Sequence, residues 1–192
     1  ESQRGHFPNS FVEEVTYNKC ELIPVILLRR SGKVGFYLII TTSVSRIGGA
    51  ELYVLRKAQF MSKKGYKVLI ITARSKPLMI REFHNFPVLT EPSVSYPCYW
   101  FTHSYIRKKI TRMTKFVLDC GATSDGLFVE STYKGNSTWA ELLSKKLNVH
   151  SCIYETNGLD TKEKGLANFL AFKARRGELL GCSKYSNQKL FA

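Results

Sequence analysis

The chain has 192 residues, a formal net charge of +14, and a composition that is 44% hydrophobic and 12% aromatic. This length suits one medium-sized domain with a real core, and the aromatic content excludes a disordered chain, because such chains lack the side chains that build a core. The apolar runs are far shorter than the roughly 20 residues of a membrane-spanning helix, and the charge favours partners that carry phosphate.

Residues 1–33 do not fit the pattern of the rest of the chain, and we interpret them as an N-terminal extension or the end of a preceding segment. They contain no charged region followed by an apolar one, so we expect no secretory signal and a cytoplasmic protein. The five cysteines are scattered and form no C-x-x-C pair, which favours free thiols over a disulfide framework or a zinc site.

Strand-like and helix-like segments alternate from residue 34 onward. Residues 34–43 form a continuous apolar run typical of a strand buried on both faces. A helix is expected at 49–64, with Gly65 as its stop, and the next strand at 67–73. The elements expected after these are a short helix at 77–83, an irregular strand at 86–89, a helix at 100–118, a strand at 126–132, a helix at 137–147 capped by Asn136 or Ser137, a strand at 149–156, a helix at 161–176 and a strand at 178–183.

This alternation indicates βαβ units. We therefore predict an α/β fold for residues 34–192: a Rossmann-like, doubly wound, mostly parallel sheet with helices on both faces. Ligands of such sheets bind beyond the carboxyl ends of the strands. The four histidines show no metal spacing, and we expect no metal site.

The stretch SRIGG, residues 45–49, lies between the first predicted strand and the first predicted helix. Glycines at this place let backbone N–H groups approach a ligand, and a helix N-terminus favours an anion. We interpret Gly48 and Gly49 as a cradle for phosphate or sugar. A simple turn is the alternative, because neither G-x-G-x-x-G nor a Walker lysine pattern is present.

The stretch GGAELYVLRKAQFMSKKGYKVLIITA resembles the first βαβ unit of GT-B glycosyltransferases of the GT4-like type (glycosyltransferase group 1), in which Gly-Gly-Ala-Glu opens the first helix. GLFVESTYKGNSTWAELLSKKLNVHSCIYETNG and FLAFKARRGELLGCS resemble the later acceptor-domain segment and the final strand of these enzymes. The resemblance spans roughly residue 34 to the C-terminus, and residues 76–125 contribute little to it. It implies the N-terminal, acceptor-binding half of a GT-B fold, with the C-terminal donor-binding domain of the same protein absent from this chain.

The resemblance also implies an activity. The whole enzyme would transfer a hexose from a nucleotide sugar to a glycan or lipid-linked acceptor, with retention of configuration, in bacterial surface polysaccharide synthesis. The nucleotide sugar would be its co-substrate. This domain would bind no cofactor itself, would be inactive alone, and would lie in the cytoplasm or peripherally on the inner face of the membrane.

The resemblance places the glycines beside the donor phosphates and the end of the fourth strand along the cleft. Many relatives carry a His just after this strand, where this chain has Thr132, so no catalytic His carries over. Glu130 is our candidate catalytic residue, because a strand-end carboxylate that faces the cleft has fewer structural reasons to exist than Glu51, which the helix dipole explains. The expected cleft residues are Gly48, Gly49, Glu51, Ser131, Thr132 and Tyr133.

Residues 92–118 contain no acid and combine the aromatic stretch YPCYWF with a basic amphipathic helix. This mixture is typical of membrane interfaces, whereas the alternative is a packed helix with a solvated charged face. The expected surface for anionic lipid or an anionic acceptor consists of Trp100, Arg107, Lys108, Lys109, Arg112 and Lys115.

A rival interpretation is a basic α/β module that binds nucleic acid or nucleotide without transferase activity. The basic residues are spread over most segments, and no helix-turn-helix, RNP-type or zinc-finger pattern is present. We therefore expect no nucleic-acid partner.

Overall fold

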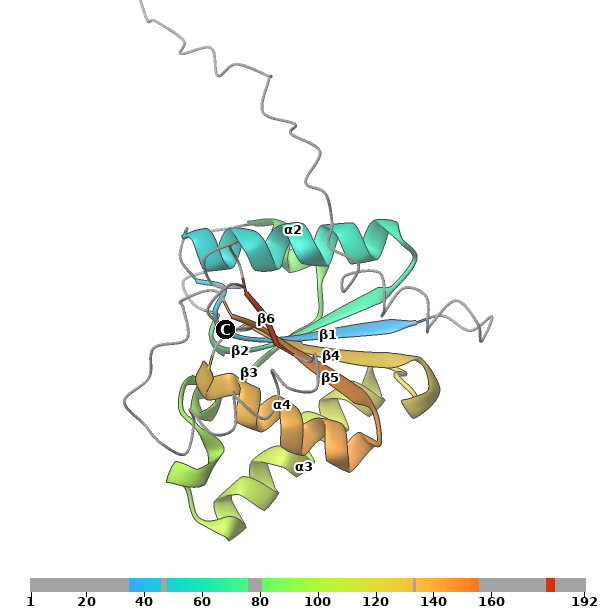
Figure 1. The fold of residues 1–192 in the computed structure, drawn as a ribbon. Coiled ribbons are helices and arrows are strands. Elements are labelled where there is room, and N and C mark those ends of the chain that lie inside the picture. Colours follow the sequence, from blue (N-terminus) through green and yellow to red (C-terminus); the bar gives the residue numbers. More distant parts are fainter. Residues whose placement is uncertain (1–34, 46–47, 76–80, 133, 156–178, 182–192) are drawn as a thin grey trace, which may run out of the picture.

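The computed structural model describes residues 35–45, 48–75, 81–132, 134–155 and 179–181. Within these ranges the chain forms a six-stranded sheet in the order β3-β2-β1-β4-β5-β6, and every neighbouring pair is parallel (Figure 1). The strands are β1 (Phe36–Ser43), β2 (Lys67–Arg74), β3 (Val88–Thr90), β4 (Leu127–Ser131), β5 (His150–Glu155) and β6 (Leu179–Gly181).

Helices cover both faces of this sheet. Helix α2 (Gly49–Lys63) lies on one face, and α3 (His103–Asp119) and α4 (Lys134–Leu147) lie on the other (Figure 1). Four short 3-10 turns complete the described connections: η1 (Arg81–Asn85), η2 (Pro92–Ser95), η3 (Cys98–Trp100) and η4 (Ser124–Gly126). The predicted α/β, Rossmann-like sheet with helices on both faces is therefore confirmed.

The middle parts of the neighbouring strands β1 and β2 are apolar because both of their faces are buried. Leu38 and Ile40 of β1 lie beside Leu69 and Ile71 of β2 in one register, and all four side chains face the α3 and α4 layer. The alternate residues of both strands pack toward α2. The middle of such a strand has no position that water can reach, which explains the absence of an alternating polar pattern there, whereas the exposed Lys67 and Arg74 are the end residues of β2.

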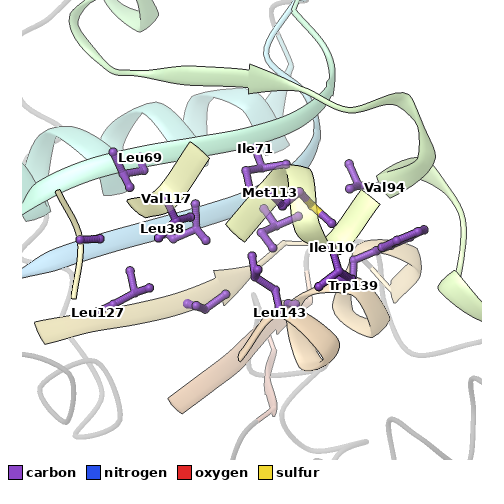
Figure 2. Close-up of a cluster of buried hydrophobic side chains, with 14 of the residues drawn as sticks. Leu38, Leu69, Ile71, Val94, Ile110, Met113, Val117, Leu127, Trp139 and Leu143 are labelled. Atoms are coloured by element: carbon purple, nitrogen blue, oxygen red, sulfur yellow. The ribbon is translucent and has the colours of Figure 1, made fainter. Parts of the chain in front are cut away.

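The core between the sheet and α3 and α4 is built around large, fully buried side chains (Figure 2). Trp139 and Leu143 of α4 and Met113 of α3 are each almost completely buried. The apolar stripe predicted for the basic helix, including Ile110 and Val117, packs into this same core. The helix therefore buries its apolar face against the sheet and leaves its charged face outside.

Helix α2, at Gly49–Lys63, lies close to its predicted range of 49–64. Its buried residues are Val54, Leu55, Ala58 and Met61. Gly65 has a φ of +89°, a left-handed conformation that glycine adopts without strain, and its N–H donates to the Ser62 carbonyl. The predicted helix stop at Gly65 is therefore confirmed.

Three predicted boundaries are wrong. Helix α4 begins at Lys134, so Asn136 and Ser137 lie inside its first turn rather than capping it. Both side chains are buried, and tertiary packing therefore outweighs the poor helix propensity of the sequence GNST. The helix predicted at 100–118 starts later, at His103, because Cys98–Trp100 form the separate turn η3, whose Cys98 N–H donates to the Thr138 hydroxyl at 2.8 Å.

The connection between β2 and β3 also differs from its prediction. The described part of the expected short helix is the 3-10 turn η1, and the irregular strand lies at Val88–Thr90. Residues 76–80, the boundary at residue 33 and the helix expected at 161–176 lie outside the described residues.

Candidate functional site

The strand order of the sheet reverses between β1 and β4. In open α/β sheets this reversal marks the place, beyond the carboxyl ends of the strands, where ligands bind. The two connections that meet there follow Ser43 and Ser131, because parallel strands end at the same edge. Each connection leads into a helix, α2 after β1 and α4 after β4. We call the ends of β1 and β4, together with the start of α2, the switch-point edge.

Hydroxyl groups line the switch-point edge. The Thr132 hydroxyl donates to the Thr41 hydroxyl at 2.9 Å, and the Thr132 N–H donates to the Ile40 carbonyl at 3.1 Å. The hydroxyls of Ser43 and Ser45 lie 3.0 Å apart. Hydroxyl groups both donate and accept hydrogen bonds, and the partly exposed Ser43 is the one of these four that a ligand with hydroxyl or phosphate oxygens could reach, because Thr41, Ser45 and Thr132 are buried.

The two glycines open α2 at this edge. Gly48 is the N-cap residue in an extended conformation, and no side chain hydrogen-bonds to its cap position. Among the described residues, a Cβ on Gly49 would meet no atom within 4 Å, whereas a Cβ on Gly48 would lie 2.7 Å from a Glu51 carboxylate oxygen. Glu51 thus lies against the helix N-terminus, as its first-turn position predicts, and Gly49 borders open space.

The sequence predicted that the Glu130 carboxylate would face the cleft, but in the structure it is buried. Its side chain is only 2% exposed and belongs to the α2 face of the sheet. The Tyr37 hydroxyl donates to Oε2 of Glu130, and the Tyr53 hydroxyl donates to Oε1 at 2.9 Å. Lys57 Nζ lies 3.5 Å from Oε2. Because Tyr53 and Lys57 belong to α2, the Glu130 carboxylate tethers β4 to this helix. A catalytic role for Glu130 stays a prediction.

The other predicted cleft residues take different positions. Ser131 and Thr132 are buried at the end of β4, where Thr132 joins the hydroxyl pair described above. Tyr133, Arg46 and Ile47 lie outside the described residues. The structure thus brings Gly48, Gly49 and Thr132 to one edge and separates them from Glu130, which lies under α2.

A buried carboxylate that the sequence reasoning missed lies where β3 ends. Glu91 is 0% exposed and accepts hydrogen bonds from the Ser93 hydroxyl at 2.8 Å, from Lys109 and from Arg112. Lys109 Nζ lies 3.0 Å from Oε1, and Arg112 Nη1 lies 3.2 Å from Oε2. The sequence contained one sign of these ion pairs, since Glu91 immediately precedes the basic, acid-free segment 92–118.

These ion pairs change the predicted basic surface of α3. Lys109 and Arg112 are engaged by Glu91, so they do not form a free anion-binding face. Trp100, Arg107, Lys108 and Lys115 remain exposed. The predicted surface therefore divides into the two residues paired with the buried Glu91, of which Arg112 is still 54% exposed, and the remaining outer residues.

The charges around Glu91 determine how its carboxyl titrates. Burial alone would raise the pKa of Glu91, but the hydrogen bonds from Lys109 and Ser93 and the charge of Lys109 outweigh burial and hold this pKa below its ordinary value of 4.5. The same hydrogen bond to Glu91 outweighs desolvation of the Lys109 ammonium and raises the pKa of Lys109.

Comparison with known protein families, curated proteins and solved structures finds no match. The family resemblance of the glycine-containing stretch therefore stays a prediction, and any functional proposal rests on the geometry of the described residues. Within those residues no group of three or more His, Cys, Asp or Glu side chains could hold a metal ion. None of the described helices has the length and apolar character needed to cross a bilayer.

The Glu91 network predicts a specific acid sensitivity. Because the folded-state pKa of Glu91 lies below its ordinary value, its stabilising contribution is complete above about pH 4.5 and is lost as the pH falls through the folded pKa. We expect the free energy of unfolding to decrease as the pH falls below about 4.5, and this decrease to be less steep in Glu91→Gln than in the wild type. Urea unfolding at pH 7, 5, 4 and 3 measures the difference, and parallel profiles for the two proteins would contradict the prediction.

Proposed function

We propose that this chain provides the acceptor-binding half of a glycosyltransferase, which moves a sugar from a nucleotide sugar to a glycan or lipid-linked acceptor. One observation carries the proposal. The two glycines that bear the family resemblance open α2 at the switch-point edge, and a side chain on Gly49 would point into open space. No packing contact with the residues that the structure describes requires a glycine there, whereas close approach of a ligand would.

The chemistry of sugar transfer suits this edge. Departure of a nucleoside diphosphate leaves negative charge, which the N–H groups at a helix N-terminus stabilise. The partly exposed hydroxyl of Ser43, which the Ser45 hydroxyl holds at 3.0 Å, supplies a donor and acceptor of the kind that sugar hydroxyls require, whereas Thr41, Ser45 and Thr132 are buried. Retaining stereochemistry, surface polysaccharide synthesis and a cytoplasmic location stay predictions of the resemblance.

Gly49→Trp tests the proposal. A Cβ at this exposed position meets no atom of the described residues within 4 Å, so a side chain can leave the backbone there, and the indole adds bulk next to the start of α2. The full-length protein is incubated with a panel of nucleotide sugars and with glycan and lipid-linked acceptors, and nucleotide release is measured. We expect one donor to be consumed, and Gly49→Trp to lower the rate about a hundredfold, because misplaced reactants cost that order of rate.

The matched control is Gln59→Trp, which introduces the same side chain at an exposed position of the same helix. Its rate should equal that of the wild type. Consumption of no nucleotide sugar, or an unchanged rate in Gly49→Trp, would contradict the proposal. Nucleotide binding that Gly49→Trp weakens, without any turnover, would instead favour the nucleotide-binding module without transferase activity.

A further inference from the structure

Residues 96–108 expose several large aromatic side chains next to basic ones, and we call them the aromatic–basic segment. The exposed fractions are 50% for Tyr96, 45% for Tyr99, 59% for Trp100 and 37% for Tyr105. Arg107 and Lys108 are also exposed, and no acid occurs between residues 92 and 118. Exposed apolar surface of this kind, when concentrated in one segment, marks an interaction site.

The segment is fixed on the protein by α4. The Trp139 indole N–H donates to the Tyr96 carbonyl at 2.7 Å, and the Cys98 N–H donates to the Thr138 hydroxyl at 2.8 Å. The Phe101 ring packs against the ring of Trp139 with centroids 5.7 Å apart. These buried anchors hold the backbone in place, so the outward position of the aromatic side chains is part of the fold.

The charge of the segment requires an anionic partner. A second copy of the same face would bring like charges together, which disfavours a symmetric dimer through this surface. Arg107 and Lys108 lie outside the ion pairs of Glu91, which engage Lys109 and Arg112. The apolar stripe of α3 is buried in the core, so this helix cannot insert its own apolar face into a bilayer. Any apolar contact with a membrane must come from the aromatic side chains.

The arrangement of the rings favours lipid over nucleic acid. Tyr96 and Trp100 stack on one another with centroids 5.6 Å apart, and Phe101 and Tyr105 stack at 4.9 Å. One face of each of these four rings is therefore already covered, which leaves less ring surface for the bases of a single-stranded nucleic acid to stack upon. Tyrosine and tryptophan combine an apolar body with a polar tip, which suits the headgroup layer of a membrane.

We propose that the aromatic–basic segment docks this domain on the surface of an anionic lipid bilayer. Tyr99 and Trp100 enter the headgroup layer, and Arg107 and Lys108 contact lipid phosphates. This proposal is independent of sugar transfer and stands or falls on binding alone.

The test uses the full protein and vesicles of phosphatidylcholine with or without phosphatidylglycerol. The chain has two tryptophans, and Trp139 is 0% exposed, so acrylamide quenching reports mainly on Trp100. We expect anionic vesicles to protect Trp100 from quenching and to shift its emission to shorter wavelength, and neutral vesicles to do neither. Trp100→Ala, measured by co-sedimentation, should weaken binding about tenfold, because it removes a large apolar contact.

Charge neutralisation is tested by Arg107→Gln with Lys108→Gln. Each positive residue near an anionic surface adds about a factor of five in affinity, so the double variant should bind roughly thirtyfold more weakly. The matched control is Lys63→Gln with Lys64→Gln at the end of α2, which removes the same charge from exposed positions on the other face of the sheet. This control should retain most of the binding.

Several results would overturn the proposal. These are absence of binding to anionic vesicles, equal losses in the two double variants, and unchanged binding by Trp100→Ala. Polyuridylate binding that Trp100→Ala abolishes would assign the segment to nucleic acid, and a dimer that Trp100→Ala dissociates would assign it to a second copy. Circular dichroism confirms that each variant folds, which is expected because all the altered side chains are exposed.

Discussion

Glu130→Leu is expected to lower the free energy of unfolding by about 4 kcal/mol, because it removes the carboxylate that joins β4 to α2. Glu130 is 2% exposed, and Tyr37, Tyr53 and Lys57 all lose their contact with it. The side chain of Lys57 is only 10% exposed, so water cannot readily replace the lost carboxylate. Urea unfolding followed by circular dichroism measures the change.

Combining Lys57→Met with Glu130→Leu tests whether the loss comes from leaving a buried charge unpaired. A buried ion pair replaced on both sides by apolar groups costs much less than the removal of one partner. The double variant Glu130→Leu with Lys57→Met should therefore be more stable than Glu130→Leu alone. Stability of Glu130→Leu within 0.5 kcal/mol of the wild type, on the order of an ordinary surface change, would contradict the tether. If Glu130→Gln keeps full stability but loses turnover, the catalytic interpretation of Glu130 is restored.

Glu91→Ala is expected to lower the free energy of unfolding by about 3 kcal/mol. Glu91 is fully buried, and its loss leaves the Lys109 ammonium, whose side chain is 18% exposed, without its carboxylate. Arg112 is 54% exposed, so water compensates it, and its share of the loss is small. We therefore expect the loss of unfolding free energy to lie at the low end of the range for buried ion pairs that lose one partner.

The control for Glu91→Ala is Glu82→Ala, since Glu82 is exposed on η1. Its removal should change the free energy of unfolding by less than about 0.5 kcal/mol. Equal effects of the two variants in urea unfolding would show that the ion pairs of Glu91 add nothing to stability.

The fold was predictable because its central strands are buried on both faces. The stretches FYLII of β1 and VLII of β2 are apolar at every position, and this pattern together with the helix between the two strands indicates a parallel sheet. The start of α4 was not predictable, because Gly135 and Asn136 are poor helix formers and only the packing around them favours the helix.

The candidate site was predictable only in part. Gly48 and Gly49 were found because they lie between a strand and a helix, a local feature of the sequence. The environment of Glu130 depends on residues 77 and 93 positions away along the chain, and that of Glu91 on residues 18 and 21 positions away. Such contacts are created by strand order and helix packing, so a local pattern could not show whether either carboxylate faces solvent or a partner.

The strand order also has a consequence for how the chain is made. β1 lies at the centre of the sheet, and its second neighbour is β4, where Phe36 pairs with Leu127. A ribosome that adds about 5 to 20 residues per second needs roughly 5 to 20 s between these two residues. During that interval one edge of the most apolar strand has no native neighbour. We therefore expect the nascent chain, rather than the finished protein, to be the form that aggregates most readily and depends most on chaperones.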